Sequence, residues 1–172
     1  NDTATTEIYL HTNFLALPTS WHFLRNNNCY DEGNAMKLEE LKSWYEGLTK
    51  ESLEHINSFY TEDVFFKDPF NEFNGIGKLE KVFDHMFEKL DNPHFIFIDD
   101  IKEGNQAFLT WDFVFESKAK KYKIHGSSHL RFNSDSKIEY HRDYWDVGEE
   151  LILKIPGLKF LYGKLRKALA VE

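Results

Sequence analysis

The sequence predicts an α+β fold, in which a cone-shaped, curved antiparallel sheet wraps around three N-terminal helices and a helical extension follows. Three observations lead to this prediction. Apolar residues recur at helical spacing through most of residues 37–90. Runs rich in aromatic and β-branched residues, separated by short turn sequences, fill residues 94–145. Residues 147–170 return to a helical pattern, so helices, a meander of strands and a helical tail follow one another along the chain.

The helical pattern divides into three predicted helices, at residues 38–48, 52–60 and 77–90. Thr49 and Ser52 can cap the second helix. The dipeptide Asn92-Pro93 ends the third, because the residue before a proline avoids helical conformation. In the tail, a break is expected at Pro156-Gly157.

A short strand, residues 64–66, is expected between the second and third helices. It ends at Asp68-Pro69, because proline cannot donate a hydrogen bond to a neighbouring strand. Four longer strands follow, at residues 94–102, 106–116, 121–132 and 137–145, and short turns join them. A sheet that bends around helices encloses a cone, and the mouth of the cone is a natural site for a ligand.

The composition limits the classes of function. No run of the 172 residues approaches the length of a membrane span, and the mean hydropathy of −0.56 is that of a soluble globular protein. A net charge of −8 argues against nucleic-acid binding, which needs a basic face. The single cysteine, Cys29, excludes an intramolecular disulfide and a Cys-rich zinc site, and it favours a cytoplasmic location. Aromatic residues make up 16% of the chain, which calls for a large core or an apolar cavity.

The first 35 residues differ from the rest. They hold one cation, Arg25, and show no sustained periodicity, whereas the regular pattern begins at Met36. We therefore expect a non-native or irregular appendage at residues 1–35, a domain at 36–146 and an amphipathic extension at 147–172. The alternative is a native arm that packs on the domain through apolar residues such as Phe14 and Trp21.

Two stretches resemble the nuclear transport factor 2-like superfamily, which includes steroid Δ5-isomerases and SnoaL-like polyketide cyclases. They are Phe59-Tyr-Thr-Glu-Asp-Val-Phe-Phe-Lys-Asp-Pro69, and His129-Leu-Arg-Phe-Asn133 followed by Lys137. The resemblance covers about residues 37–145. It implies the cone fold, a cavity for a small hydrophobic molecule, chemistry without a metal or cofactor, and a homodimer through the outer sheet face. It is fairly specific for the fold and poor for function, because this fold hosts enzymes, binders and transport factors.

The resemblance also suggests roles for individual residues. Asp68 falls where the isomerases carry their catalytic base, Ser128 where they carry a protonated acid, and Trp44, beside Tyr45, where they carry a tyrosine. Neither an indole N–H nor a serine hydroxyl is the acidic donor that stabilises a dienolate, and loss of one such donor costs about 10²–10³ in rate. Steroid isomerisation by that mechanism is therefore not expected.

The last predicted strand adds an acid–base pair. Glu139, His141, Asp143 and Trp145 alternate onto one face, and by resemblance this face looks into the cone. A carboxylate beside an imidazole orients the ring and suits proton abstraction or water activation. The predicted catalytic residues are thus Asp68, His141 and Asp143. The predicted substrate-binding residues are Trp44, Tyr45, Tyr60, Phe65, Phe83, Trp111, Phe113, Ser128 and Trp145.

Simpler interpretations remain open. Asp68 can merely cap a turn, and His141 with Asp143 can face solvent or form a structural pair. The domain can then be a non-catalytic module that binds a hydrophobic ligand or a protein. His125 and His129 share a strand face, but residues four apart in a strand lie about 13 Å apart, so no metal site is expected there. The tail is expected to act as a lid, a buttress or a dimer contact, with contact to a membrane surface as the less favoured alternative.

Overall fold

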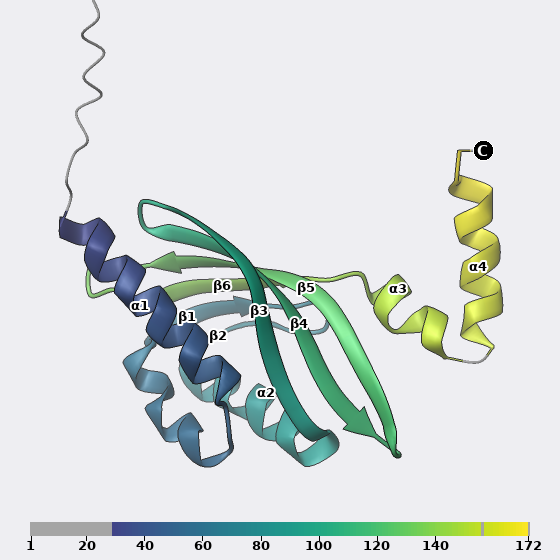
Figure 1. Cartoon of the computed structure of the whole chain (residues 1–172), viewed down its shortest axis with the longest axis horizontal. Coiled ribbons are helices and arrows are strands. Elements are labelled where there is room, and N and C mark those ends of the chain that lie inside the picture. The colour runs from purple at the N-terminus through teal and green to yellow at the C-terminus, as the bar shows by residue number, and fades with distance from the viewer. Residues whose placement is uncertain (1–28, 156, 172) are drawn as a thin grey trace, which may run out of the picture.

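The structure is a computed structural model that describes residues 29–155 and 157–171. One six-stranded sheet curves around helices and does not close on itself (Figure 1). The elements before the long strands are α1 (Cys29–Glu46), the 3₁₀ helix η1 (Glu51–Ser58), β1 (Tyr60–Lys67), β2 (Glu72–Asn74) and α2 (Ile76–Lys89). The long strands are β3 (Asp91–Glu103), β4 (Gln106–Ser117), β5 (Lys120–Phe132) and β6 (Ile138–Tyr144). The tail holds α3 (Val147–Glu150), the 3₁₀ helix η2 (Ile152–Lys154) and α4 (Leu158–Leu169).

The strand order is β2-β1-β6-β5-β4-β3. Strands β3 to β6 form an antiparallel meander, β1 pairs in parallel with β6, and β2 pairs antiparallel with β1. The register shifts at Ile98 in β3, between the paired residues Phe97 and Asp99, and at Glu139 in β6, between the paired residues Ile138 and Tyr140. Such bulges bend a strand and increase its twist, which accounts for the curvature that gives the sheet a concave face.

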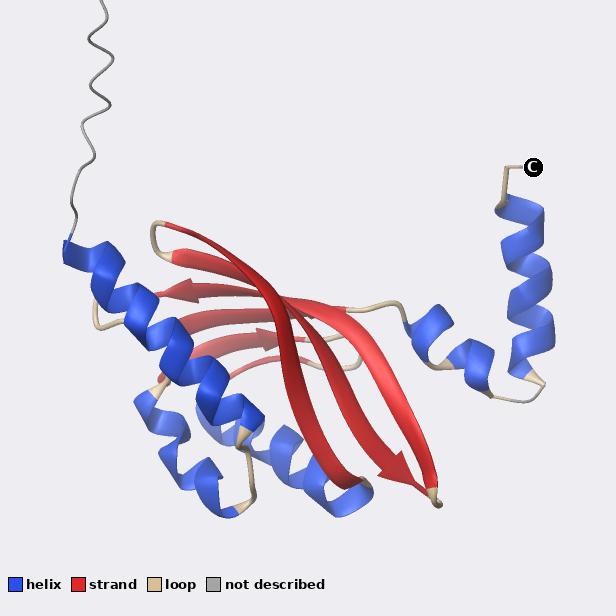
Figure 2. Ribbon diagram, viewed as in Figure 1, coloured by secondary structure: helices blue, strands red, loops and turns tan. Residues whose placement is uncertain are grey.

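The three N-terminal helical segments cover this concave face (Figure 2). Each contributes fully buried aliphatic side chains, such as Leu41 from α1, Ile56 from η1 and Leu79 from α2. They pack on sheet residues such as Leu130 and Ile138. Truncating one of these side chains to alanine typically costs about 2–5 kcal/mol, so this core fixes the helices against the sheet.

The predicted α+β cone is confirmed, with corrections at several boundaries. The second helix is a 3₁₀ helix whose N-cap residue is Lys50, which makes no side-chain capping hydrogen bond. Thr49 and Ser52 bond each other across its start: the Thr49 N–H donates to Ser52 Oγ at 2.9 Å, and the Ser52 N–H donates to Thr49 Oγ1 at 3.2 Å. Strand β2 was not predicted, because three residues show no alternation and β2 exists only through its pairing with β1. Asn92 and Pro93 lie within β3 rather than in a terminator of α2, which already ends at Lys89.

The predicted N-terminal appendage, residues 1–35, lies outside the described residues as far as Asn28. Helix α1 begins at Cys29 and continues past Met36 without a break. The first regular element of the structure therefore starts before the expected domain boundary.

The tail is helical and interrupted, as predicted. Asp146 caps α3, because its carboxylate accepts hydrogen bonds from the backbone N–H groups of Gly148 (2.7 Å) and Glu149 (3.1 Å). Lys154, at the end of η2, bonds the carbonyl of Lys123 on β5 at 2.8 Å, which ties the start of the tail to the sheet. None of the helices in the described part of the chain is long and apolar enough to cross a membrane.

Candidate functional site

A pocket of about 300 Å³ lies inside the curved sheet, closed by side chains from α1 and α2. Most of its lining is aromatic or aliphatic, with contributions from β3 (Phe95, Phe97), β4 (Trp111, Phe113) and α2 (Phe83, Met86). The polar side chains on its wall are Tyr45, Asp68, Ser128, His141 and Asp143. An apolar pocket with a few converging polar groups is the usual form of a small-molecule site.

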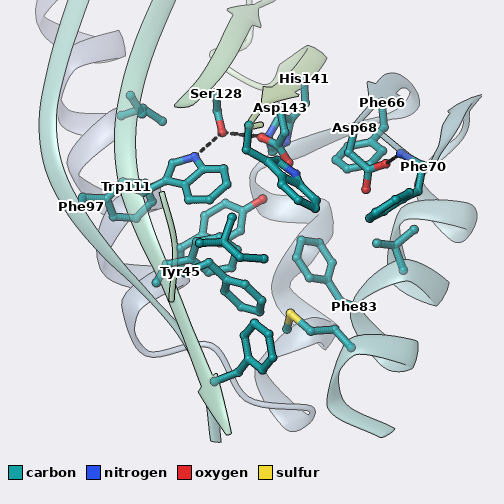
Figure 3. Close-up of a pocket in the computed structure, with 18 of the residues that line it drawn as sticks. Tyr45, Phe66, Asp68, Phe70, Phe83, Phe97, Trp111, Ser128, His141 and Asp143 are labelled. Atoms are coloured by element: carbon teal, nitrogen blue, oxygen red, sulfur yellow. Dashed lines mark hydrogen bonds and ion pairs between the residues drawn. The ribbon is translucent and has the colours of Figure 1, made fainter. Parts of the chain in front are cut away.

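The polar side chains from β4, β5 and β6 form one chain of hydrogen bonds. The indole Nε1 of Trp111 donates to Ser128 Oγ at 2.8 Å, and Ser128 Oγ donates to Asp143 Oδ1 at 2.5 Å. His141 Nε2 lies 2.8 Å from the same Asp143 oxygen and 3.3 Å from Ser128 Oγ. Figure 3 shows Trp111, Ser128 and Asp143 linked along one side of the pocket.

The chain continues from the other nitrogen of His141 toward the helices. His141 Nδ1 lies 2.8 Å from the hydroxyl of Tyr60, which in turn lies 2.5 Å from the hydroxyl of Tyr45. Tyr60 is 1% exposed and stands behind the pocket wall, whereas Tyr45 lines the pocket. We call the six residues Trp111, Ser128, Asp143, His141, Tyr60 and Tyr45 the polar relay.

Strand geometry explains how the relay forms. Ser128 lies directly opposite Asp143 in the β5–β6 ladder, so their side chains share the concave face. On the neighbouring strand, Trp111 lies opposite Gly126, and a Cβ atom on Gly126 would come within 2.4 Å of the indole ring. Glycine at position 126 therefore leaves the space that lets the Trp111 ring lie over β5 and reach Ser128.

The direction of the hydrogen bonds depends on the protonation of His141. With a neutral imidazole whose proton is on Nε2, His141 donates to Asp143 and accepts from Tyr60, and Tyr60 accepts from Tyr45. With both ring nitrogens protonated, His141 donates to Tyr60, Tyr60 donates to Tyr45, and Tyr45 keeps a proton for a group in the pocket. Burial raises the pKa of both phenols well above the ordinary value, so each tyrosine carries its hydroxyl proton in either arrangement.

Asp68 lies elsewhere on the wall and has a second set of partners. Its carboxylate accepts from the backbone N–H groups of Phe70 (2.7 Å) and Asn71 (2.6 Å), and from the Asn71 side-chain amide. These contacts hold the turn between β1 and β2, as the simpler interpretation expected. Figure 3 shows Asp68 beside Phe70, on the other side of the pocket from Ser128.

Most predicted site residues line the pocket: Tyr45, Asp68, Phe83, Trp111, Phe113, Ser128, His141, Asp143 and Trp145. Three do not. The Trp44 indole donates to the backbone carbonyl of Ser52 at 3.0 Å and packs on Phe59, Tyr60 lies behind His141, and Phe65 stacks on Tyr140 across the outer face. Phe65 was assigned to the wrong face of β1. Successive strand residues alternate between the two faces, and it is the neighbouring Phe66 that lines the pocket.

The alternation predicted for β6 also fails at its first two residues. Ile138 is buried in the core and Glu139 is exposed, which reverses the faces expected for them. The cause is a bulge, since Tyr140 pairs with Arg131 and Ile138 with Phe132, which leaves Glu139 without a place in the ladder. Sequence reasoning also missed Phe95 and Phe97, whose alternation along β3 was a usable signal.

Within residues 29–155 and 157–171, no group of three or more His, Cys, Asp or Glu side chains is placed to hold a metal ion. His125 instead contacts Asp112, and His129 contacts Gln106, both on the outer face of the sheet.

Comparison with known proteins places this arrangement in a family. The model of the SnoaL-like domain matches residues 41–141, which contain the pocket strands and most of the relay. The chain belongs to the SnoaL-like domain family. No curated protein matches the sequence.

Several solved structures share the fold of this SnoaL-like domain, although their sequence identity to it is low. A putative SnoaL-like polyketide cyclase from Jannaschia sp. is 10% identical, with a TM-score of 0.59 over 67% of this chain and 87% of that one. An LEH-like epoxide hydrolase from M. tuberculosis is 12% identical, with a TM-score of 0.58 over 80% of this chain and 96% of that one. A hypothetical protein with a ketosteroid isomerase-like fold from Catenulispora acidiphila, solved in complex with trimethylamine, is 13% identical, with a TM-score of 0.57 over 67% of this chain and 88% of that one. These likenesses establish the fold that the SnoaL-like domain shares with them.

Proposed function

We propose that this SnoaL-like domain is an enzyme that performs acid–base chemistry without a cofactor on a small hydrophobic substrate. The observation that carries the proposal is the His141–Asp143 pair, 2.8 Å apart on the wall of a mostly apolar pocket. Ionisable side chains are costly to bury in such surroundings, and clusters of them in a pocket mark candidate sites.

Asp143 is the proposed base. Its Oδ1 is occupied by Ser128 and His141, while its side chain keeps 19% exposure, compared with 5% for His141. The second carboxylate oxygen is therefore the relay atom best placed to take a proton from a substrate C–H or from water. Both nitrogens of His141 are engaged, so His141 is a positioning residue that acts through Asp143 and Tyr60.

Tyr45 is the proposed donor to the oxygen on which negative charge develops. It stands at the pocket end of the relay, and its raised pKa keeps it protonated. Protonation of His141 would reverse the Tyr45–Tyr60 bond and free the Tyr45 proton for the substrate. A positioned donor of this kind is worth about 10²–10³ in rate.

The test is a panel of small apolar ketones, epoxides and polyketide-like compounds, followed by mass spectrometry of the products. We expect at least one compound to be converted, and Asp143→Asn to lower the rate constant by about 10²–10⁴ while leaving ligand binding in calorimetry intact. Asp112→Asn is the matched control, because Asp112 is a carboxylate that contacts a histidine on the outer face. Conversion by Asp143→Asn at the rate of the unmodified protein would falsify the assignment of the base.

The second candidate is a non-catalytic module that binds a hydrophobic ligand. One observation favours it: the carboxylate of Asp68, at the position of the base in the related isomerases, is held by the turn it caps. Tight binding of an apolar ligand with no conversion of any compound would support this candidate against the enzyme.

A further inference from the structure

In helix α4, Leu158–Leu169, the leucines and the basic side chains lie on two different faces, and exposed Phe160 lies among the basic side chains, with its ring centroid 4.5 Å from Lys164 Nζ. One face carries leucines at positions 158, 161, 165 and 169, a spacing that places them along one stripe of a helix. The other face carries Lys159, Lys164, Arg166 and Lys167, and the helix contains no acidic residue. This basic helix belongs to a chain whose net charge is −8.

The leucine stripe is not buried against the rest of the described structure. Its four leucines are between 49% and 76% exposed. In Figure 1, α4 stands away from the sheet and from α1 and α2. The contact with α3 is made by Tyr162, which packs so closely on Gly148 that a Cβ atom there would lie 2.0 Å from the phenol oxygen. Tyr162 therefore fixes α4 by one edge and leaves the stripe free.

The charges argue against pairing of this stripe with the α4 helix of a second copy. Helices that pair through a leucine stripe usually carry residues of opposite charge along its borders. In α4 both borders carry cations only, Arg166 and Lys159 on one side and Lys164 on the other. Two such helices would bring like charges together in either orientation. An anionic lipid surface, with phosphate groups above a hydrocarbon layer, matches both faces of α4. The long basic side chains can reach the phosphates while the leucines enter the hydrocarbon layer.

We propose that α4 is a binding site for anionic membrane surfaces, where it lies parallel to the surface with its leucine stripe in the lipid. Twelve residues make a helix of about 18 Å, well short of the roughly 30 Å hydrocarbon core, so the helix lies on the membrane rather than across it. The proposal stands on α4 alone and does not depend on the proposed enzyme activity.

The experiment is flotation of the full chain with vesicles of phosphatidylcholine and with vesicles that also contain phosphatidylglycerol. We expect the protein to float with the anionic vesicles at low salt, and to be released by high salt, which screens the charges. The double variant Lys164→Glu/Lys167→Glu should lower the partition coefficient by at least about tenfold. The variant Leu161→Gln/Leu165→Gln keeps the charge and should also abolish flotation. All four side chains are exposed, so these variants are expected to fold.

The matched control is Lys81→Glu/Lys89→Glu, which makes the same change of net charge at exposed positions of α2. It should float like the unmodified chain. Failure of the unmodified chain to float with anionic vesicles would overturn the proposal, and so would equal loss of flotation in this control. The proposal is also overturned if the leucine variant dissociates a dimer in sedimentation while vesicle flotation stays unchanged, because a second copy would then cover the stripe.

Discussion

The two faces of the sheet each carry a histidine beside an aspartate, and the two pairs differ in their surroundings. On the concave face, His141 and Asp143 are 2.8 Å apart, with side chains 5% and 19% exposed. On the outer face, His125 and Asp112 are 2.9 Å apart, but the histidine is 57% exposed and Asp112 also bonds Lys123. The contact geometry of the pairs is nearly the same. The two aspartates are similarly exposed (19% and 16%), so the inner pair is distinguished by its buried histidine and by the bond of that histidine to Tyr60. These properties, rather than the contact itself, make it a candidate site.

The largest expected difference is in stability. Replacing His141 with alanine leaves a cavity and removes the partner of Tyr60 and Asp143, which should lower the free energy of unfolding by about 2–4 kcal/mol. His125→Ala at the outer pair should change it by no more than about 0.5 kcal/mol. Urea denaturation of both variants measures the difference. Equal effects would show that burial does not separate the two pairs.

The next largest effect on stability tests the space that Gly126 leaves for the Trp111 ring. In Gly126→Ala, the new methyl group meets the Trp111 ring at 2.4 Å, so we expect overpacking to cost about 1–3 kcal/mol. The Trp111–Ser128 bond should weaken as the ring moves. Gly77→Ala in α2 is the control, because a methyl group added there would have no atom of another element within 4 Å. Thermal unfolding and tryptophan fluorescence follow both changes, and an unshifted Gly126→Ala spectrum would contradict the account.

Removal of one hydroxyl group from the polar relay should lower the free energy of unfolding by a smaller amount. Tyr60→Phe loses its bonds to His141 and Tyr45 and should cost about 1–2 kcal/mol at neutral pH. Tyr144→Phe, which removes an exposed hydroxyl, is the control. Guanidinium denaturation of both variants at pH 7 gives the values, and a loss as large in Tyr144→Phe would argue against a special role for the relay.

The same tyrosines predict a stability change at alkaline pH. Burial raises the pKa of Tyr45 and Tyr60 in the folded chain, so the folded state keeps phenol protons that the unfolded state releases above about pH 10. The stabilisation is fully present below that pH and is lost as pH rises above it. We expect the free energy of unfolding to fall above pH 10, and to fall less steeply in Tyr60→Phe. A curve of the same slope in both proteins would contradict this.

The smallest effect belongs to the outer pair. Hydrogen bonds from Lys123 and then His125 lower the pKa of Asp112. A lowered pKa contributes stability above the ordinary value for aspartate, about 3.9, and this contribution is lost as pH falls below it. Since the pair is at the surface, Asp112→Asn should cost less than about 1 kcal/mol at neutral pH. Denaturation in molar salt, where the cost should vanish, checks that the effect is a screened surface interaction.

The sequence was informative wherever the physics is local. Helical spacing, turn residues and strand alternation predicted the order of the long elements. The alternation of β6 placed His141, Asp143 and Trp145 on one face, which lines the pocket. The same rule failed at Glu139, where a bulge shifts the faces. At Phe65 the alternation holds, but the wrong face of β1 was expected to line the pocket. Periodicity cannot show such a bulge, because it depends on pairing with another strand.

By itself, the sequence determined the α+β class, the amphipathic tail and the types of residue available to a site. The tertiary structure alone decided which of them meet. It set Ser128 opposite Asp143, brought Tyr60 to His141 across 81 residues of chain, and gave Trp111 its place over Gly126. It also engaged the Asp68 carboxylate in the hydrogen bonds of a turn, and it left the leucines of α4 exposed. The physical reason is that residue type and spacing act within one element, whereas strand register and helix docking are fixed by contacts between elements distant in the chain.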